Sequence, residues 1–140
     1  MSATNALKYL NPETNETELI TFGFDRYKTN GNLFVALVHE HNDGQFYYRP
    51  LTVNCNRLPW NADNMQATVC IDTQIPGIED FIAQNKLGTP IGRSLPDKWD
   101  STVQYPEYEL NLQEMCKHLY KDSAWLDLVI AEKSEAEYYR

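Results

Sequence analysis

The sequence has few of the features that mark secreted, membrane-spanning or zinc-binding chains. Its three cysteines, Cys55, Cys70 and Cys116, are far apart and form no CxxC motif. An odd number of widely spaced cysteines indicates reduced thiols rather than a disulfide framework or a zinc knuckle. No apolar run approaches the roughly 18 residues that a membrane span needs, and the first residues lack the basic and apolar regions of a signal peptide. We therefore expect a cytoplasmic protein.

Basic residues are also scarce. The chain has 12 lysines and arginines against 20 aspartates and glutamates, and its net charge is −8. Nucleic acids and anionic membranes attract proteins through lysine and arginine, so we expect neither as a direct partner. The simplest explanation of an excess of acidic residues is that the net charge keeps the protein soluble. Among partners it favours a protein with a basic surface, because opposite charges speed and orient the encounter.

The sequence contains none of the common catalytic or nucleotide-binding motifs, such as GxxxxGK[ST], GxGxxG, GxSxG or HExxH. His39 and His41 stand two residues apart and, with Asp43 or His118, could bind a divalent ion. The predicted strand pairing, however, places His39 on the core face, which favours a hydrogen-bonded structural histidine pair. We therefore predict no metal and no cofactor.

Four further residues allow chemistry but have simpler interpretations. Asp72 could act as a general acid or base, although an acceptor for the following turn explains it equally well. Cys70 has no neighbouring histidine or cation in the sequence and is predicted to be a buried thiol. Gly92 and Arg93 could bind an anion, although a helix end and a surface arginine explain this stretch too. No catalytic residue is predicted. A small metal-dependent or acid/base enzyme and a small-ligand or anion-binding module remain alternatives.

Alternating apolar and polar residues predict strands over residues 17–28, 32–40, 45–54 and 66–72. Asn30-Gly31 is the strongest short signal for a hairpin between the first two. A two-residue turn there places Phe22 opposite His39. One face of this pair then holds the predicted core residues: Ile20, Phe22, Phe24, Leu33, Val35 and Leu37.

The spacing of apolar residues changes to that of a helix in three places. Over residues 76–87, Ile78, Phe81 and Ile82 follow the i, i+3, i+4 pattern of one buried stripe. Residues 112–121 show the same periodicity after a capping-box-like start. A further helix is predicted over residues 124–137.

The remaining segments complete the predicted organisation. Residues 88–102 are polar, hold two prolines and predict a long loop, and residues 103–110 predict an edge strand. Residues 1–16 are expected to form a flexible N-terminal arm, and residues 17–140 a single domain. The predicted fold class is α+β, with an antiparallel sheet of about four to five strands and two to three helices packed on it.

Three stretches taken together resemble a known family. They are Asn30-Gly31-Asn32-Leu33 with Leu51-Thr52-Val53-Asn54 behind it, Asp72-Thr73 with PGIEDFIAQNKLG and Pro90-Ile91-Gly92-Arg93, and Tyr105-Pro106-Glu107-Tyr108. Over roughly residues 17–115 this order resembles a small family of uncharacterised bacterial proteins, a domain of unknown function common on plasmids, prophages and conjugative elements. The family has no assigned activity, so the resemblance transfers no catalytic residue and implies only a mobile-element setting.

The sequence offers two candidate partner-binding segments that combine aromatics with acids. The first is the loop with Trp99 between Asp97 and Asp100, where burial of the indole is hard to arrange. The second is the C-terminal helix with Trp125 and Asp127. We expect a non-enzymatic interaction protein of a phage or mobile element, for example an inhibitor of a host defence nuclease, and leave a homodimer open.

Overall fold

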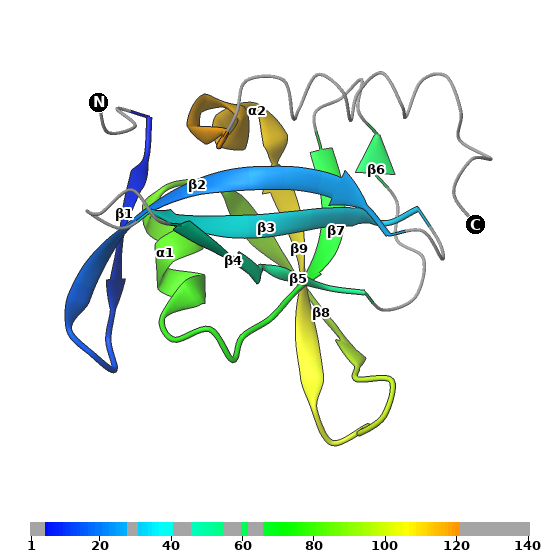
Figure 1. Ribbon diagram of the computed structural model, residues 1–140. Coiled ribbons are helices and arrows are strands. Elements are labelled where there is room, and N and C mark those ends of the chain that lie inside the picture. Colours follow the sequence, from blue (N-terminus) through cyan, green and yellow to red (C-terminus); the bar gives the residue numbers. More distant parts are fainter. Residues whose placement is uncertain (1–4, 28–30, 41–45, 55–59, 62–65, 121–140) are drawn as a thin grey trace.

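The computed structural model describes residues 5–27, 31–40, 46–54, 60–61 and 66–120 (Figure 1). In these residues the strands form two antiparallel sheets. The first has the order β1-β2-β3-β4, and the second has the order β5-β7-β9-β8 with β6 also paired to β7. The predicted α+β class is confirmed, but the strands are divided between two sheets rather than gathered in one.

The first sheet contains β1 (Leu7–Asn11), β2 (Glu16–Arg26), β3 (Leu33–Glu40) and β4 (Phe46–Pro50). The second contains β5 (Thr52–Val53), β6 (Trp60–Asn61), β7 (Gln66–Ile71), β8 (Gly88–Pro96) and β9 (Gln104–Asn111). Helix α1 (Ile78–Gln84) connects β7 to β8, and helix α2 (Leu112–Met115) follows β9 and continues as a short 3-10 helix, Cys116–His118. In the part of the chain that the structure describes, no helix has the length and apolar character needed to cross a membrane.

The pairing of β2 with β3 confirms the predicted core face and corrects the predicted register. Phe22 lies opposite Leu37 rather than His39. The reason is a longer reversal than Asn-Gly implies, because the amide of Tyr27 donates to the carbonyl of Asn32 at 2.9 Å and closes the hairpin there. The shift is two residues, which equals the side-chain period of a strand, so no side chain changes face. All six predicted core residues of the pair are buried.

Leu51 joins the two sheets. It lies between β4 and β5, where the prediction had one strand over residues 45–54. Its amide donates to the carbonyl of Val35 in the first sheet at 2.8 Å, and its carbonyl accepts from the amide of Asp72, after β7, at 2.9 Å. Pro50, which has no amide hydrogen, ends the edge strand β4 just before this crossing.

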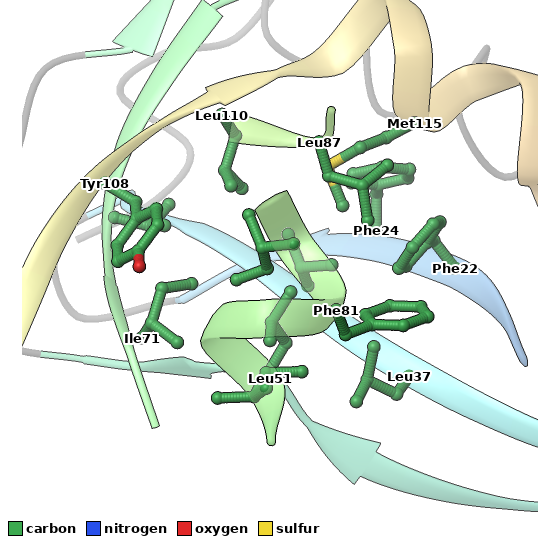
Figure 2. Close-up of a cluster of buried hydrophobic side chains, with 14 of the residues drawn as sticks. Phe22, Phe24, Leu37, Leu51, Ile71, Phe81, Leu87, Tyr108, Leu110 and Met115 are labelled. Atoms are coloured by element: carbon green, nitrogen blue, oxygen red, sulfur yellow. The ribbon is translucent and has the colours of Figure 1, made fainter. Parts of the chain in front are cut away.

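The main core lies between the sheets and around α1. Figure 2 shows Phe22, Phe24 and Leu37 from the first sheet near Phe81 from α1, with Tyr108 and Leu110 from β9 in the same cluster. The predicted buried stripe of α1, which is Ile78, Phe81 and Ile82, is confirmed. The inward side chains of β7, which are Ala67, Val69 and Ile71, are also buried as predicted.

The N-terminal segment is more ordered than the predicted arm of residues 1–16. Residues Leu7–Asn11 form β1, which pairs with the start of β2. Tyr9 is buried in the core, and its hydroxyl donates to the carbonyl of Pro76 before α1. The strand ladder, the buried Tyr9 and the partly buried Leu7 hold this segment. Two apolar positions are too few to stand out in a polar stretch.

The largest difference from the predicted organisation lies in residues 88–102. This segment was predicted to be a loop, but residues Gly88–Pro96 form strand β8. Because β8 takes the edge of the second sheet, β9 lies between β7 and β8 and is not the edge strand that was predicted over residues 103–110. Nearly every residue of β8 is exposed, so no alternation of apolar and polar residues marks it in the sequence.

The helix predicted over residues 112–121 starts where expected and ends early. The side chain of Asn111 accepts the amide of Glu114 at 3.1 Å and caps α2 as predicted. The helical backbone stops before Leu119, which is extended, and the amide of Tyr120 donates to the carbonyl of Phe22 at 2.9 Å. This contact along β2 replaces the last helical turn. The helix predicted over residues 124–137 lies outside the described residues.

Candidate partner-binding site

A two-stranded ribbon extends from the second sheet. The pairing of β7 with β9 ends at Cys70 and Glu107, whereas β8 and β9 stay paired from Ser94 opposite Pro106 to Pro96 opposite Gln104. Residues 94–106, hereafter the ribbon, therefore continue past the edge of the sheet. Figure 1 shows the ribbon and its closing loop protruding at the bottom of the molecule.

The base of the ribbon is anchored by a small apolar cluster separate from the main core. The buried residues Cys70 and Tyr105 pack with the partly buried Val53, Leu95 and Val103. The predicted burial of the Cys70 thiol is thus confirmed. This cluster ties the ribbon to the outer face of the second sheet and fixes the direction in which it projects.

The tip of the ribbon presents Trp99 to solvent with 92% of its surface exposed. The backbone around it is held by Asp97. One carboxylate oxygen, Oδ2, accepts the amides of Trp99 at 2.9 Å and Asp100 at 3.1 Å, and Oδ1 accepts the hydroxyl of Tyr105 at 2.9 Å. The tip is therefore a hydrogen-bonded structure that displays an indole, not an irregular stretch of chain.

Electrostatics at the tip agree with this geometry. The hydrogen bond from the amide of Trp99, followed by that from the hydroxyl of Tyr105, lowers the pKa of the Asp97 carboxyl below its usual range. Asp97 is therefore negatively charged at neutral pH. Asp100 has a similar local function, because its Oδ1 accepts both the amide of Thr102 at 3.1 Å and the hydroxyl at 2.6 Å.

Two exposed apolar side chains belong to the β8–β9 hairpin. In the described residues, the large apolar side chains with high exposure are Leu10, Ile91 and Trp99. Ile91 lies in the irregularity of β8 between Pro90 and Ser94, and only Leu10 belongs to another part of the molecule. Ile91 and Trp99 are separate positions on this hairpin, and Trp99 is by far the more exposed of the two.

The anion-binding candidates lie on the same strand but are engaged within the protein. Gly92 has a φ of 95°, a value that suits glycine, and forms the irregularity of β8. The guanidinium of Arg93 contacts the carboxylate of the buried Glu107 at 3.1 Å. An anion at this place would compete with that carboxylate for the arginine.

Asp72 behaves as the turn interpretation predicts. Its Oδ1 accepts the amide of Gln74 at 3.0 Å in the turn before α1. Beside this turn, Thr73, Ile75, Gly77, Ile78, Glu79 and Asp80 line a hollow of about 240 Å³. The carboxylate of Glu79 accepts the hydroxyl of Tyr108, and burial together with this contact raises the pKa of Tyr108. Glu79 is thus already engaged by a protonated tyrosine.

The histidines of the metal hypothesis do not converge in the described part of the chain. His39 is buried on the core face, as predicted, where Nδ1 bonds to the carboxylate of Glu18 and the ring meets Tyr9 edge-on. His118 is bonded to the carbonyl of Asn5 at 2.6 Å. His41 and Asp43 lie outside the described residues. Within the described residues, no group of three His, Cys, Asp or Glu could hold a metal ion.

Tyr105, at the base of the ribbon, is a residue of the site that sequence reasoning missed. It touches Asp97 only because β8 and β9 pair, and the pairing was not predicted. The hydrogen bond from Trp99 to Asp97 had a local signal, since an aspartate often accepts the amide two residues further on. The other predicted partner-binding residues, Trp125 and Asp127, lie outside the described residues.

Comparison with known proteins adds no relative: no family model, no curated protein and no solved structure matches this chain. The resemblance to a mobile-element family therefore stays a prediction.

Proposed function

We propose that this protein binds another protein in the cytoplasm through the tip of the ribbon, with Trp99 as the anchor. The observation that supports this is the combination of 92% exposure of Trp99 with a backbone held by the carboxylate of Asp97. Tryptophan is among the residues that contribute most to interface energy. The thiol state of Cys70 and Cys116 suits a reducing compartment.

An exposed indole on a fixed backbone is well suited to a partner with an apolar pocket. Seating the ring removes a large apolar surface from water, and little backbone freedom is lost because the tip is already hydrogen-bonded. The net charge of −8 and the acidic residue Asp100, next to Trp99 in the sequence, favour a basic rim around that pocket. A nuclease of the host's defence is one protein of this class, since enzymes that bind nucleic acid carry basic surfaces.

The first experiment identifies the partner and tests the anchor together. Full-length wild-type protein, Trp99→Ala and the matched control Leu10→Ala are immobilised and exposed to host lysate, and retained proteins are identified by mass spectrometry. Leu10 is a suitable control because it is also an exposed large apolar residue, 56% exposed, but lies on β1. The partner is then purified and its affinity for each variant is measured by isothermal titration calorimetry.

We expect Trp99→Ala to weaken binding by about 30-fold or more, the usual size of a hot-spot effect, and Leu10→Ala to bind normally. Thermal unfolding of Trp99→Ala should match the wild type, since the removed ring makes few contacts. Normal binding by a folded Trp99→Ala variant would place the interface elsewhere. Sedimentation of the protein alone tests whether the partner is a second copy of this chain. Only in that case does Trp99→Ala change the mass of the particle in solution from dimer to monomer.

A further inference from the structure

The contacts of Asp97 point to a function other than the attraction of a basic partner. Both of its carboxylate oxygens are directed at groups of the tip itself, namely two successive backbone amides and one hydroxyl. A steering charge needs no such partners and acts through solvent over several ångströms. The geometry instead resembles that of a capping residue, whose side chain accepts hydrogen bonds from the backbone amides of its own loop.

The hydrogen bonds of Asp97 form a connected path from the buried cluster to the indole. Tyr105 is only 8% exposed and belongs to the cluster at the base of the ribbon. Its hydroxyl fixes Oδ1 of Asp97, and Oδ2 of the same carboxylate fixes the amide of Trp99. The amide of Asp97 also donates to the carbonyl of Val103 across the ribbon at 2.9 Å. The amide of Trp99 is therefore linked to the base through the carboxylate of Asp97, while backbone hydrogen bonds of Val103 to Asp97 and Asp100 close the ribbon beside it.

We infer that Asp97 and Tyr105 are positioning residues that preorganise Trp99 for insertion into a preformed apolar pocket. This inference rests on the proposed function of the ribbon tip and specifies the kind of partner. A tip that is ordered before binding loses little conformational entropy on association. The partner's pocket therefore binds an indole that is already in position and does not have to order a flexible loop. Asp97 then contributes to affinity through geometry, and the negative charge of the surface contributes separately to the encounter rate.

Three variants separate positioning from steering. Asp97→Ala removes both the charge and the acceptors. Asp97→Asn removes the charge but keeps an oxygen that can accept the amides of Trp99 and Asp100. Tyr105→Phe removes only the hydroxyl and leaves the ring to fill the cluster at the base. The full-length chain is used throughout, and circular dichroism verifies that each variant is folded.

The first measurement needs no partner. Backbone order at Trp99 and Asp100 is measured by ¹⁵N relaxation, in which a rigid amide has an order parameter near 0.85 and a flexible one falls below about 0.6. We expect rigid values in the wild type and in Asp97→Asn, a clear loss in Asp97→Ala, and an intermediate loss in Tyr105→Phe. Unchanged order in a folded Asp97→Ala variant would overturn the inference.

The second measurement uses the purified partner and surface plasmon resonance. If Asp97 positions Trp99, Asp97→Ala weakens affinity about ten-fold while Asp97→Asn stays within about two-fold of the wild type, at low and high salt alike. If Asp97 steers, both variants slow association equally at low salt, and the inference is wrong. Failure of the proposed function gives a different result. In that case Trp99→Ala binds the partner with normal affinity, whether or not the order parameters show a rigid tip.

Discussion

Replacing Leu51 with alanine should test how the two sheets are held together. Leu51 is 1% exposed and lies where the chain passes from the first sheet to the second. The substitution removes three buried carbon atoms, worth about 2.4 kcal/mol at ~0.8 kcal/mol each. The cavity left between close-packed side chains adds to that, so we expect a loss of about 3–4 kcal/mol, inside the range of ~2–5 kcal/mol for buried leucines. Alanine keeps the amide and carbonyl, so the backbone hydrogen bonds at this position are retained.

Urea denaturation followed by far-UV circular dichroism measures this loss. With a slope of about 2 kcal/mol per molar urea, usual for a chain of this size, the midpoint should fall by about 1.5–2 M. Leu10→Ala is the matched control, since that leucine is 56% exposed on the edge strand β1 and should change stability by less than about 0.5 kcal/mol. A loss below about 1 kcal/mol for Leu51→Ala, with an unchanged slope, would refute close packing of Leu51 between the sheets.

Three further predictions concern single positions. Gly88→Ala should cost about 1–3 kcal/mol in urea denaturation, because the new Cβ would lie 2.8 Å from a backbone oxygen of β9, whereas Gly23→Ala meets nothing closer than 3.9 Å and should be tolerated. Burial, aided by the contact with Glu79, raises the pKa of Tyr108, so its contribution to stability is complete below the unfolded value near 10 and is lost as pH rises above it; Tyr108→Phe should therefore flatten the alkaline decline in melting temperature. Burial raises the pKa of Cys116 to about 11, so peptide mapping after iodoacetamide treatment at neutral pH should find this site alkylated much more slowly in the native than in the unfolded protein.

Sequence patterns identified the buried faces well and the turn lengths poorly. Residues alternate around Phe22 and Phe24, and Phe81 follows a helical spacing, because one face of each element is turned to the core. Such a pattern can be recognised within a short stretch of sequence. The length of the reversal between Tyr27 and Asn32 depends on how the hairpin closes. Asn-Gly supplies a strong local preference for a two-residue turn. A shift of two residues buries the same side chains, so the alternation of apolar residues could not distinguish the two registers.

Strand β8 shows why an exposed strand escapes detection. Its prolines at positions 90 and 96 are typical of a loop, and both are compatible with an edge strand. Leu87 and Asp97 form backbone hydrogen bonds with the β9 side, so the alternation of a ladder turns Pro90 and Pro96 outward, where a missing amide costs no bond. The same arrangement blunts the edge against pairing with another chain.

The candidate site was predictable in part. A tryptophan in a polar stretch between prolines has little to bury against, and Trp99 is indeed exposed. The contact between Asp97 and Tyr105, which holds that backbone, could not be predicted, because it depends on the pairing of β8 with β9. Proximity of this kind follows from the assembled sheet and not from the spacing of residues along the chain.

The contact between Phe22 and Leu119 has a consequence for synthesis of the protein on the ribosome. Pairing with β1 covers the first part of β2 as far as Ile20, and at Phe22 the same side of the strand is met by Leu119 and Tyr120. The side chain of Asn5 also bonds to the carbonyl of Leu119, 114 positions away. A nascent chain therefore leaves part of an uncharged, β-prone stretch, ITFGF, unpaired on this side until Leu119 and Tyr120 have been made. Chains that stop before Leu119 should leave this edge open and aggregate in the cell, whereas the full-length chain closes it by folding.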